Sequence, residues 1–219
     1  MSAAYVFDAY GTLFDVHSAV FAARDEIGPA AAELSALWRG KQLEYTWVYS
    51  MLGRPASFRS LTAAALDFAM AAQRIEGAEL RGKLLDAYDR LAAYAEAPAV
   101  LQALRGRRKR LAILSNGDPD MLQSALRSAA LGVTMDVVLS VAESGVFKPS
   151  GRVYRQASQK LGLDRGAITF VSANRWDVAG ARAFGFSTAW INRTGAPDEY
   201  RDLPAHRTHA DLRGILETE

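Results

Sequence analysis

Short apolar runs recur along this chain, and from residue 111 onward they alternate with stretches of helical periodicity. Such alternation of strand and helix patterns is typical of a parallel sheet that helices cover on both faces. The sequence therefore predicts an α/β fold with a Rossmann-like, doubly wound parallel sheet. The strands are predicted at Tyr5–Phe7, Leu111–Ser115, Asp136–Val141, Ile168–Ser172 and Ser187–Asn192, and the helices at Pro119–Ala130, Gly151–Leu161 and Trp176–Phe184.

The stretch after the first predicted strand follows another pattern. Residues 16–95 are rich in Ala and Leu, contain no convincing strand, and are interrupted by segments such as Gly28-Pro29 and Gly53-Arg54-Pro55. Glycine and proline interrupt helices, so these segments divide the stretch into several of them. We expect residues 16–95 to form a helical cap domain, inserted into a core domain made of residues 1–15 and 96–219.

One long helix is predicted within this segment, over Ala32–Leu52. On a helical projection, large apolar side chains form one stripe and a mixed set lies on the opposite side. This indicates that one face packs against the protein and that the other lines a cleft. One stripe consists of Leu34, Leu37, Trp38, Tyr45, Val48 and Leu52, and the opposite side carries Arg39, Leu43, Thr46 and Ser50.

Composition narrows the class of protein further. Of the 219 residues, 50% are hydrophobic and 23% are charged, a balance typical of a globular protein. The net charge of +2 does not favour nucleic-acid binding, and the lack of cysteine excludes disulfides and thiolate sites. No apolar stretch is long enough to span a bilayer, and the N-terminus does not resemble a signal peptide. We therefore expect a cytoplasmic protein without a membrane partner.

The three histidines of the chain are scattered. His17 stands alone, whereas His206 and His209 lie in a polar C-terminal segment where we expect a solvated loop rather than a metal pair. Without a nucleophile motif beside them, they give no support to a histidine-based catalytic triad.

Polar residues stand at the ends of four predicted strands, namely Asp8, Ser115-Asn116, Lys148 and Ser172-x-Asn174-x-x-Asp177. Any one of them alone is more often a helix cap or a turn residue. The carboxyl ends of parallel strands meet at one edge of the sheet, where ligands bind. Four such groups together therefore favour a functional site at that edge.

These motifs resemble those of the haloacid dehalogenase superfamily, and they extend across essentially the whole chain. The first is Phe7-Asp8-x-Tyr10-Gly11-Thr12-Leu13 and the third is Lys148-Pro149. The resemblance is closer to its type II L-2-haloacid dehalogenases. Their characteristic stretches are matched by residues 8–17, by Leu37-Trp38-Arg39-Gly40 and the residues up to Trp47, and by Trp190-Ile-Asn-Arg-Thr-Gly195.

Two positions separate this chain from the metal-dependent phosphatases of the superfamily. Those enzymes carry an acid two residues after the nucleophile and a Gly-Asp pair downstream, where this chain has Tyr10 and Ser172-Ala173. Both the Mg²⁺ site and the proton donor for an alkoxide are then incomplete. A halide leaving group needs no such acid, so the sequence favours attack on carbon, without metal or cofactor.

The resemblance implies that Asp8 displaces halide from C2 of a short L-2-haloalkanoic acid, and that water then hydrolyses the aspartyl ester to release a D-2-hydroxy acid. It implies that Arg39 and Asn116 hold the halide, and that Asn174 and Asp177 position and deprotonate the water. The implied catalytic residues are Asp8, Thr12, Arg39, Lys148, Ser172, Asn174 and Asp177. The implied substrate-binding residues are Ala9, Tyr10, Arg39, Leu43, Phe58, Ser115, Asn116, Lys148, Tyr154 and Trp176.

Other functions remain open at this stage. They are hydrolysis of another small C2-substituted acid, including fluoroacetate, a Mg²⁺-dependent phosphatase, and a non-catalytic protein with the same fold. The expected partners are the small 2-haloacid and the halide product. The resemblance, together with a stripe of Leu34, Trp38 and Tyr45 that we expect to be exposed, also predicts a homodimer.

Overall fold

A computed structural model describes residues 2–217 of the chain. Its centre is a six-stranded sheet with the strand order β3-β2-β1-β4-β5-β6, in which every neighbouring pair is parallel. The predicted α/β fold is confirmed. The strands are β1 (Ala4–Phe7), β2 (Arg110–Ser115), β3 (Val137–Ser140), β4 (Ile168–Ser172), β5 (Ser187–Ile191) and β6 (Arg207–His209).

Strand β1 lies in the middle of the sheet, between β2 and β4, and all four of its side chains are buried. Phe7 is in register with Ile113 of β2 on one side and with Val171 of β4 on the other. The strand order therefore reverses at β1, which creates a crevice outside the carboxyl ends of the strands. Asp8, the residue that follows Phe7, therefore lies at this edge of the sheet.

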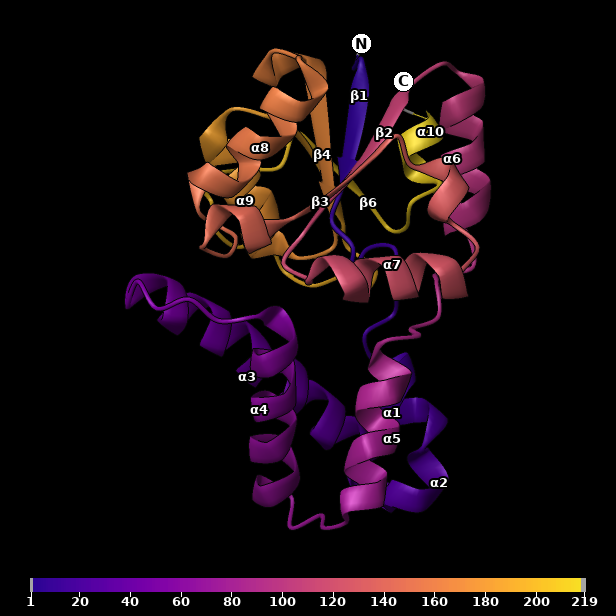
Figure 1. The fold of residues 1–219 in the computed structure, drawn as a ribbon. Helices are drawn as coiled ribbons and strands as arrows, with labels where there is room; N and C mark the ends of the chain where they lie inside the picture. The colour runs from indigo at the N-terminus through magenta and orange to yellow at the C-terminus, as the bar shows by residue number, and fades with distance from the viewer. Residues whose placement is uncertain (1, 218–219) are drawn as a thin grey trace.

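Helices cover both faces of the sheet. Figure 1 shows α8 and α9 on one side of the strands and α6 and α10 on the other. The apolar side chains of α8 recur at helical spacing, at Val153, Ala157 and Leu161, and this stripe is buried. No helix within residues 2–217 combines the length and the apolar character needed to cross a membrane. These helices are α6 (Ala97–Gly106), α7 (Pro119–Ser128), α8 (Gly151–Leu161), α9 (Arg175–Phe184) and α10 (Gly214–Glu217).

Between β1 and β2 the chain forms the helical stretch that the sequence predicts. In Figure 1 these helices lie beyond the carboxyl ends of the strands. The longest of them, α3, packs against α4. Whether residues 16–95 act as a separate cap domain stays a prediction. The helices are α1 (Ser18–Ala22), α2 (Arg24–Ile27), α3 (Ala31–Met51), α4 (Phe58–Ala72) and α5 (Ala78–Tyr88).

The faces of α3 differ from those that the sequence predicts. Leu34 and Trp38 are buried, so the expectation that they form an exposed stripe is wrong. The buried face continues through Gln42 and Thr46, two polar residues. Their side chains have hydrogen-bond partners inside the protein, which makes their burial tolerable. A pattern of hydrophobicity does not reveal such positions.

The C-terminal segment also differs from the expected solvated loop. Residues Arg207–His209 form the edge strand β6, which pairs with β5. Just before it, Nδ1 of His206 accepts a hydrogen bond from the backbone N–H of Thr188, at 3.1 Å. Burial lowers the pKa of both His206 and His209. The strand is short and polar, so it lacks the apolar alternation by which strands are predicted.

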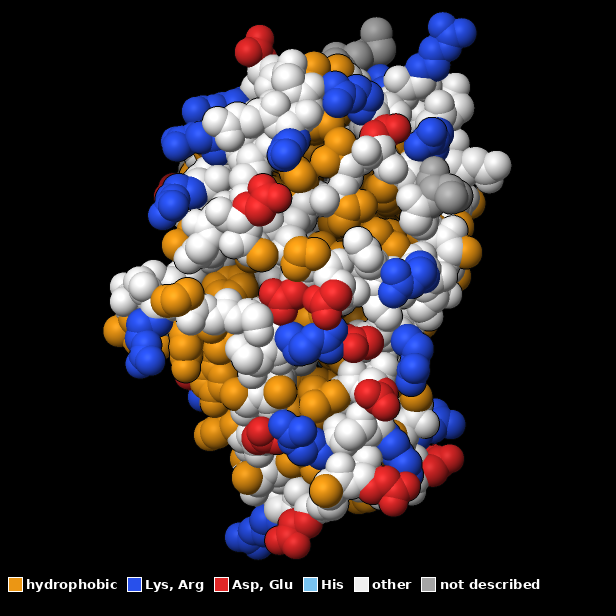
Figure 2. Space-filling model, in the orientation of Figure 1, with side chains coloured by type: hydrophobic (Ala, Val, Ile, Leu, Met, Phe, Trp, Pro, Cys, Tyr) orange, Lys and Arg blue, Asp and Glu red, His pale blue; other side chains and the backbone are white. Residues whose placement is uncertain are grey.

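A cluster of charged side chains joins the sheet domain to the helices below it. Figure 2 shows acidic and basic side chains next to one another where α7 meets these helices. Arg59 of α4 pairs with Asp89 at 2.7 Å and with Asp120 of α7 at 2.9 Å. The carboxylate of Asp118 accepts hydrogen bonds from the backbone N–H groups of Phe58 and Arg59. The loop after β2 thus holds the N-terminus of α4.

Candidate active site

Asp8 follows β1 directly, and its carboxylate is the centre of a buried polar cluster. Its backbone N–H donates to the carbonyl of Val171 at 2.9 Å, which extends the pairing with β4 by one residue. The side chain is only 5% exposed. Its Oδ1 accepts from Nζ of Lys148 at 3.0 Å. Its Oδ2 accepts from the Thr12 hydroxyl at 2.9 Å, from Nδ2 of Asn174 at 2.8 Å and from the Ser172 hydroxyl at 3.3 Å.

The turn after Asp8 brings Thr12 back to this carboxylate. Gly11 has a φ of 89°, a conformation that glycine adopts without steric cost. The carbonyl of Ala9 accepts the backbone N–H of Leu13 at 2.9 Å, which closes the turn. The hydroxyl of Thr12 also accepts from the backbone N–H of Ala173 at 2.9 Å. Thr12 therefore links the loop after β1 to the loop after β4.

Lys148 lies between two carboxylates and is 1% exposed. Its Nζ is 2.8 Å from Oδ2 of Asp177, in addition to its contact with Asp8. Burial by itself lowers the pKa of the ammonium, but the charges of Asp177 and Asp8 outweigh it, so the net pKa is raised. The other carboxylate, Asp177, is held from its far side as well: the Tyr154 hydroxyl donates to its Oδ1 at 2.6 Å.

Asp177 is fully buried near the start of α9. Burial raises its pKa to about 6, against the opposing charge of Lys148. Such a group is ionised at neutral pH and is basic enough to accept a proton. The cluster therefore holds one carboxylate that several donors fix and a second carboxylate, Asp177, whose pKa burial raises.

The loop after β2 supplies Ser115 and Asn116. The Ser115 hydroxyl oxygen accepts from the backbone N–H of Gly117 at 3.1 Å, and Oδ1 of Asn116 accepts from the backbone N–H of Lys148 at 3.0 Å. Gly117 packs against Tyr10 so closely that a Cβ at this position would lie 2.6 Å from Cε2 of that ring. This contact explains why residue 117 has no side chain.

Arg39 reaches the same place from α3, in the helical stretch. Its Nη2 donates to the carbonyl of Tyr10 at 3.2 Å and to Oδ1 of Asn174 at 3.4 Å. Nδ2 of Asn174 in turn donates to Asp8 and to the Tyr10 carbonyl. The structure thus brings together residues that are far apart in the sequence and that the motifs singled out separately.

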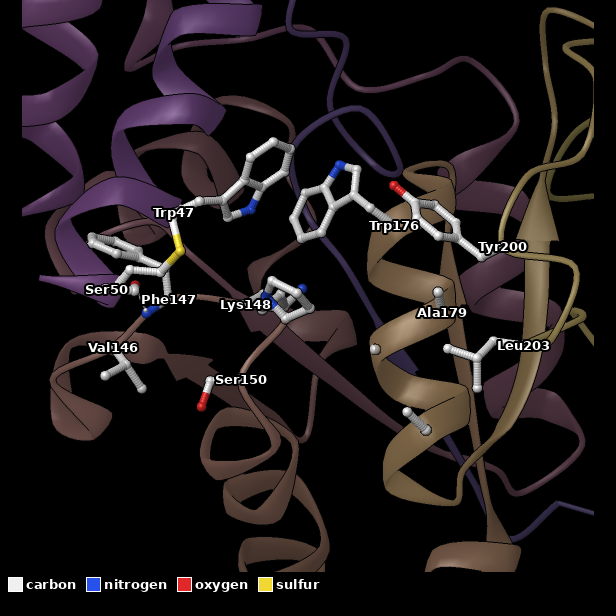
Figure 3. A pocket seen from close by; sticks show the side chains of 14 residues that line it. Trp47, Ser50, Val146, Phe147, Lys148, Ser150, Trp176, Ala179, Tyr200 and Leu203 are labelled. Carbon is white, nitrogen blue, oxygen red and sulfur yellow. Dashed lines mark hydrogen bonds between the residues drawn. The ribbon is translucent and has the colours of Figure 1, made fainter. Parts of the chain in front are cut away.

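Four side chains are predicted to form the apolar surroundings of the substrate, namely Tyr10, Leu43, Phe58 and Trp176. The ring centroids of Tyr10 and Phe58 are 5.4 Å apart, and both side chains are buried. Leu43 is half-buried on α3, whereas Trp176 belongs to a neighbouring groove, where it makes an edge contact with Trp47 at 5.5 Å. This groove has a volume of about 700 Å³, and Trp47, Trp176 and Lys148 all line it (Figure 3).

Two contacts of the site involve residues to which the sequence assigned no role. Gln42 Oε1 accepts from Nη1 of Arg39 at 2.7 Å, and Arg193 Nη2 donates to the carbonyl of Thr12 at 3.1 Å. Gln42 stands three residues after Arg39, so the spacing on one helix face is the signal that could have revealed it. Arg193 lies within the quoted stretch from Trp190 to Gly195.

The residues around Asp8 suit a carboxylate that attacks carbon. Tyr10 and Ala173 stand beside Asp8, where a phosphatase of similar architecture needs acids. Within residues 2–217 no group of three or more His, Cys, Asp or Glu side chains is arranged to hold a metal ion. An ionised carboxylate that a lysine orients and partly compensates can attack an electrophilic carbon from a fixed direction.

The chain is similar to several haloacid dehalogenases in sequence and in structure. Residues 3–185 match the family model of the haloacid dehalogenase-like hydrolases. The chain is 50% identical over 212 residues to an (S)-2-haloacid dehalogenase of Pseudomonas sp. (strain YL), a match that covers 96% of this chain and 91% of that protein. It is 47% identical over 210 residues to (S)-2-haloacid dehalogenase 1 of Pseudomonas sp. (strain CBS-3), covering 95% and 92%.

A solved structure adds a chemical observation. The L-2-haloacid dehalogenase from Xanthobacter autotrophicus with chloropropionic acid covalently bound aligns with a TM-score of 0.89 at 33% sequence identity, and the alignment covers 100% of both chains. The similarity therefore extends over the sheet and over the helices between β1 and β2.

Proposed function

This chain belongs to the haloacid dehalogenase-like hydrolase family, and from that premise we propose that it is an (S)-2-haloacid dehalogenase. It hydrolyses short L-2-haloalkanoic acids to D-2-hydroxy acids through an ester at Asp8. The observation that carries the proposal is the setting of the Asp8 carboxylate, which Lys148 and three neutral donors hold, with Tyr10 in place of a second acid.

In the first step Oδ1 of Asp8 attacks C2 of the substrate opposite the carbon–halogen bond. The new O–C2 bond forms as the halide leaves with its bonding electron pair, and C2 is inverted. Oδ1 is the attacking oxygen because, among residues 2–217, it accepts from Lys148 alone. Oδ2 instead accepts from Thr12, from Asn174 and from Ser172, whose hydroxyl it shares with Asp177. The relative solved with covalently bound chloropropionic acid supports a covalent intermediate.

Substrate orientation depends on donors around the crevice. The Ser115 oxygen accepts from Gly117, so its proton is available to the substrate carboxylate, together with the backbone N–H groups at Ala9 and Tyr10 and with Lys148. Asn116 uses its carbonyl oxygen on the backbone of Lys148, which leaves its NH₂ group to donate to the departing halide. Arg39 supplies the positive charge for that halide.

In the second step water attacks Cγ of the ester rather than C2. Asp177, with its pKa raised to about 6, accepts the proton of a water that Asn174 positions. Charge develops on Oδ2, where Thr12, Ser172 and Asn174 already donate, and such preorganised donors stabilise an oxyanion. The bond from Cγ to the C2 oxygen breaks, the released alkoxide takes up a proton, and Asp8 is regenerated.

Further properties of the enzyme are part of the proposal. Residues 16–95 act as a cap over a core of residues 1–15 and 96–219, and the enzyme is cytoplasmic, cofactor-free and homodimeric. Support for the dimer comes from the C-terminal end of α3, where Val48, Met51 and Leu52 are 38%, 79% and 63% exposed. Sedimentation equilibrium of the wild type and of Met51→Lys tests the dimer, since a charge at a buried interface would dissociate it.

Halide release tests the reaction. We expect chloride from L-2-chloropropionate, none from the D-enantiomer, and D-lactate as the product. Monochloroacetate and fluoroacetate extend the test to unsubstituted acids, and p-nitrophenyl phosphate with and without Mg²⁺ tests the phosphatase alternative. In a single turnover in ¹⁸O-labelled water the hydroxy acid must be unlabelled, because its oxygen comes from Asp8. Label in the product of the first turnover would exclude the covalent route.

A further inference from the structure

Gln42 is a buried polar residue that the reaction described above does not use. It lies on α3, one turn after Arg39, and its side chain is 0% exposed. Its Oε1 accepts from Nη1 of Arg39 at 2.7 Å and from the Tyr88 hydroxyl at 3.1 Å. Its Nε2 donates to the Thr62 hydroxyl oxygen at 2.6 Å. The amide is therefore bonded at both ends.

The orientation of this amide is fixed by its neighbours. The Thr62 hydroxyl donates its only proton to the carbonyl of Phe58, at 2.7 Å. It can therefore only accept from Gln42, which identifies the group facing Thr62 as the NH₂ and the group facing Arg39 as the oxygen. A chain of directed hydrogen bonds thus runs from the backbone of α4, through Thr62 and Gln42, to the guanidinium of Arg39.

Tyr88 reinforces this orientation. Burial raises the pKa of its hydroxyl, and the charge of Arg39 lowers it by less, so the group remains protonated and donates to Gln42. A carbonyl oxygen with two lone pairs accepts both Tyr88 and Arg39. Rotation of the Gln42 amide would leave the Tyr88 hydroxyl and the guanidinium facing an NH₂ group, a costly arrangement in a buried site.

Arg39 is consequently held at both of its terminal nitrogens. Gln42 holds Nη1 from the helical side, while the Tyr10 carbonyl and Asn174 hold Nη2 from the side of the sheet. We propose that Gln42 is a positioning residue that fixes the guanidinium of Arg39 where the halide leaves. This inference rests on the proposed function, in which Arg39 binds the leaving group. Without Gln42 the guanidinium pivots about Nη2 and its charge no longer meets the halide in a fixed geometry.

Three variants test the inference. Gln42→Met keeps an unbranched side chain of similar length but removes both the acceptor and the donor. Gln42→Glu keeps the shape and introduces a charge that neutralises Arg39. Thr46→Val is the matched control, because Thr46 is buried one turn later on the same face and its hydroxyl donates to the carbonyl of Leu43, within α3 itself.

For Gln42→Met we expect kcat for L-2-chloropropionate to fall by about tenfold to a hundredfold, the loss typical of a misplaced group in an active site. Chloride is a poorer leaving group than bromide and depends more on a positive charge. The ratio of kcat for the 2-bromo acid to kcat for the 2-chloro acid should therefore rise several-fold, with a smaller change in KM. Gln42→Glu should raise the same ratio, and Thr46→Val should leave it at the wild-type value.

Folding defects are separated from positioning by a double variant. Gln42→Met with Tyr88→Phe removes both partners of one buried hydrogen bond, which restores stability in such sites. It should regain part of the melting temperature that Gln42→Met loses, because the Tyr88 hydroxyl is no longer left unpaired, and it should keep the raised bromide-to-chloride ratio. A wild-type ratio in a folded Gln42→Met variant would overturn the inference.

The geometry is tested apart from activity by crystal structures of the wild type and of Gln42→Met, each soaked in bromide. A displaced guanidinium and a lost bromide peak in the variant support the inference, and an unmoved Arg39 overturns it. If the wild type releases no halide from any 2-haloacid, the proposed function fails. The position of Arg39 in the two crystals still decides whether Gln42 positions it.

Discussion

The two regions that meet at the site contribute charge in different ways. The sheet edge supplies Asp8, Lys148 and Asp177, which compensate one another at distances of 2.8 to 3.0 Å. The helix α3 supplies Arg39, whose hydrogen bonds go to neutral oxygens of Gln42, Tyr10 and Asn174. The sheet edge therefore holds one cation between two carboxylates for covalent chemistry, whereas the helix presents a cation to an anion that forms only during the reaction.

The largest effect should come from the centre of the sheet edge. Asp8→Asn replaces the nucleophile by a neutral amide, and we expect halide release to fall by about 10⁴-fold or more, as for other nucleophile deletions. Halide release from L-2-chloropropionate measures the loss, and circular dichroism checks that the fold persists. Activity close to that of the wild type in a folded variant would show that the nucleophile lies elsewhere.

Removal of the central cation should affect both activity and stability. Lys148→Met leaves two buried carboxylates without their partner, and breaking a buried pair in this way costs about 3–5 kcal/mol of unfolding free energy. Urea unfolding at pH 8 measures this cost. The control is Lys83→Met, since Lys83 pairs with Glu26 and Glu79 on the surface and its loss should change little. Equal losses in the two variants would contradict the role of Lys148 as the buried partner of the two carboxylates.

A change at Asp177 should slow hydrolysis of the ester without stopping the displacement of halide. The Asp177 pKa of about 6 predicts that steady-state turnover falls as the pH drops below 6, because protonated Asp177 is no longer a base. Asp177→Asn should slow turnover by about 10²- to 10⁴-fold, the usual contribution of a general base. The initial burst of one halide per site should persist, because displacement at C2 needs no base. Rapid-quench halide assays measure both phases, and a burst that disappears with turnover would rule out this division.

Asp177 should also make the unfolding free energy depend on pH. The pKa of Asp177 is raised from 3.8 to about 6, so between these values the folded protein binds more protons than the unfolded chain. Its contribution to the unfolding free energy is therefore fully present below pH 3.8 and is lost as the pH rises through 6. Urea titrations of the wild type across this range should show this downward contribution, and Asp177→Asn should lack it.

The smallest effect should come from the joint between the two regions. Asp118→Ala removes two hydrogen bonds to the N-terminus of α4 and should cost about 1 kcal/mol. Because Phe58 begins this helix, KM should also rise a few-fold. Ser57→Ala is the control, since the Ser57 hydroxyl caps the same helix from within it, by accepting from the backbone N–H of Ser60. A similar rise of KM in both variants would make the effect one of helix stability alone.

The two regions also differ in how far the sequence predicts them. Strands β1 to β5 lie within two residues of their predicted bounds, because a buried parallel strand is a continuous apolar run. Asp8 and Ser172 followed from the rule that polar groups at strand ends meet. Gln42 did not, because its partners Thr62 and Tyr88 lie 20 and 46 residues away. The buried polar face of α3 depends on such distant partners, so the hydrophobic pattern does not reveal it, and only the spacing of Gln42 from Arg39 points to it.

The central place of β1 has a consequence for the synthesis of the chain. β1 leaves the ribosome before the other strands of this sheet, and its neighbours β2 and β4 begin only at Arg110 and Ile168. Until then its unpaired edges and apolar side chains are open to other chains, an aggregation hazard in any nascent protein. The helices that follow it are complete before β2 exists. The Asp8 carboxylate is therefore made long before its partners Lys148 and Asp177. A nascent chain that ends before them has no complete catalytic centre.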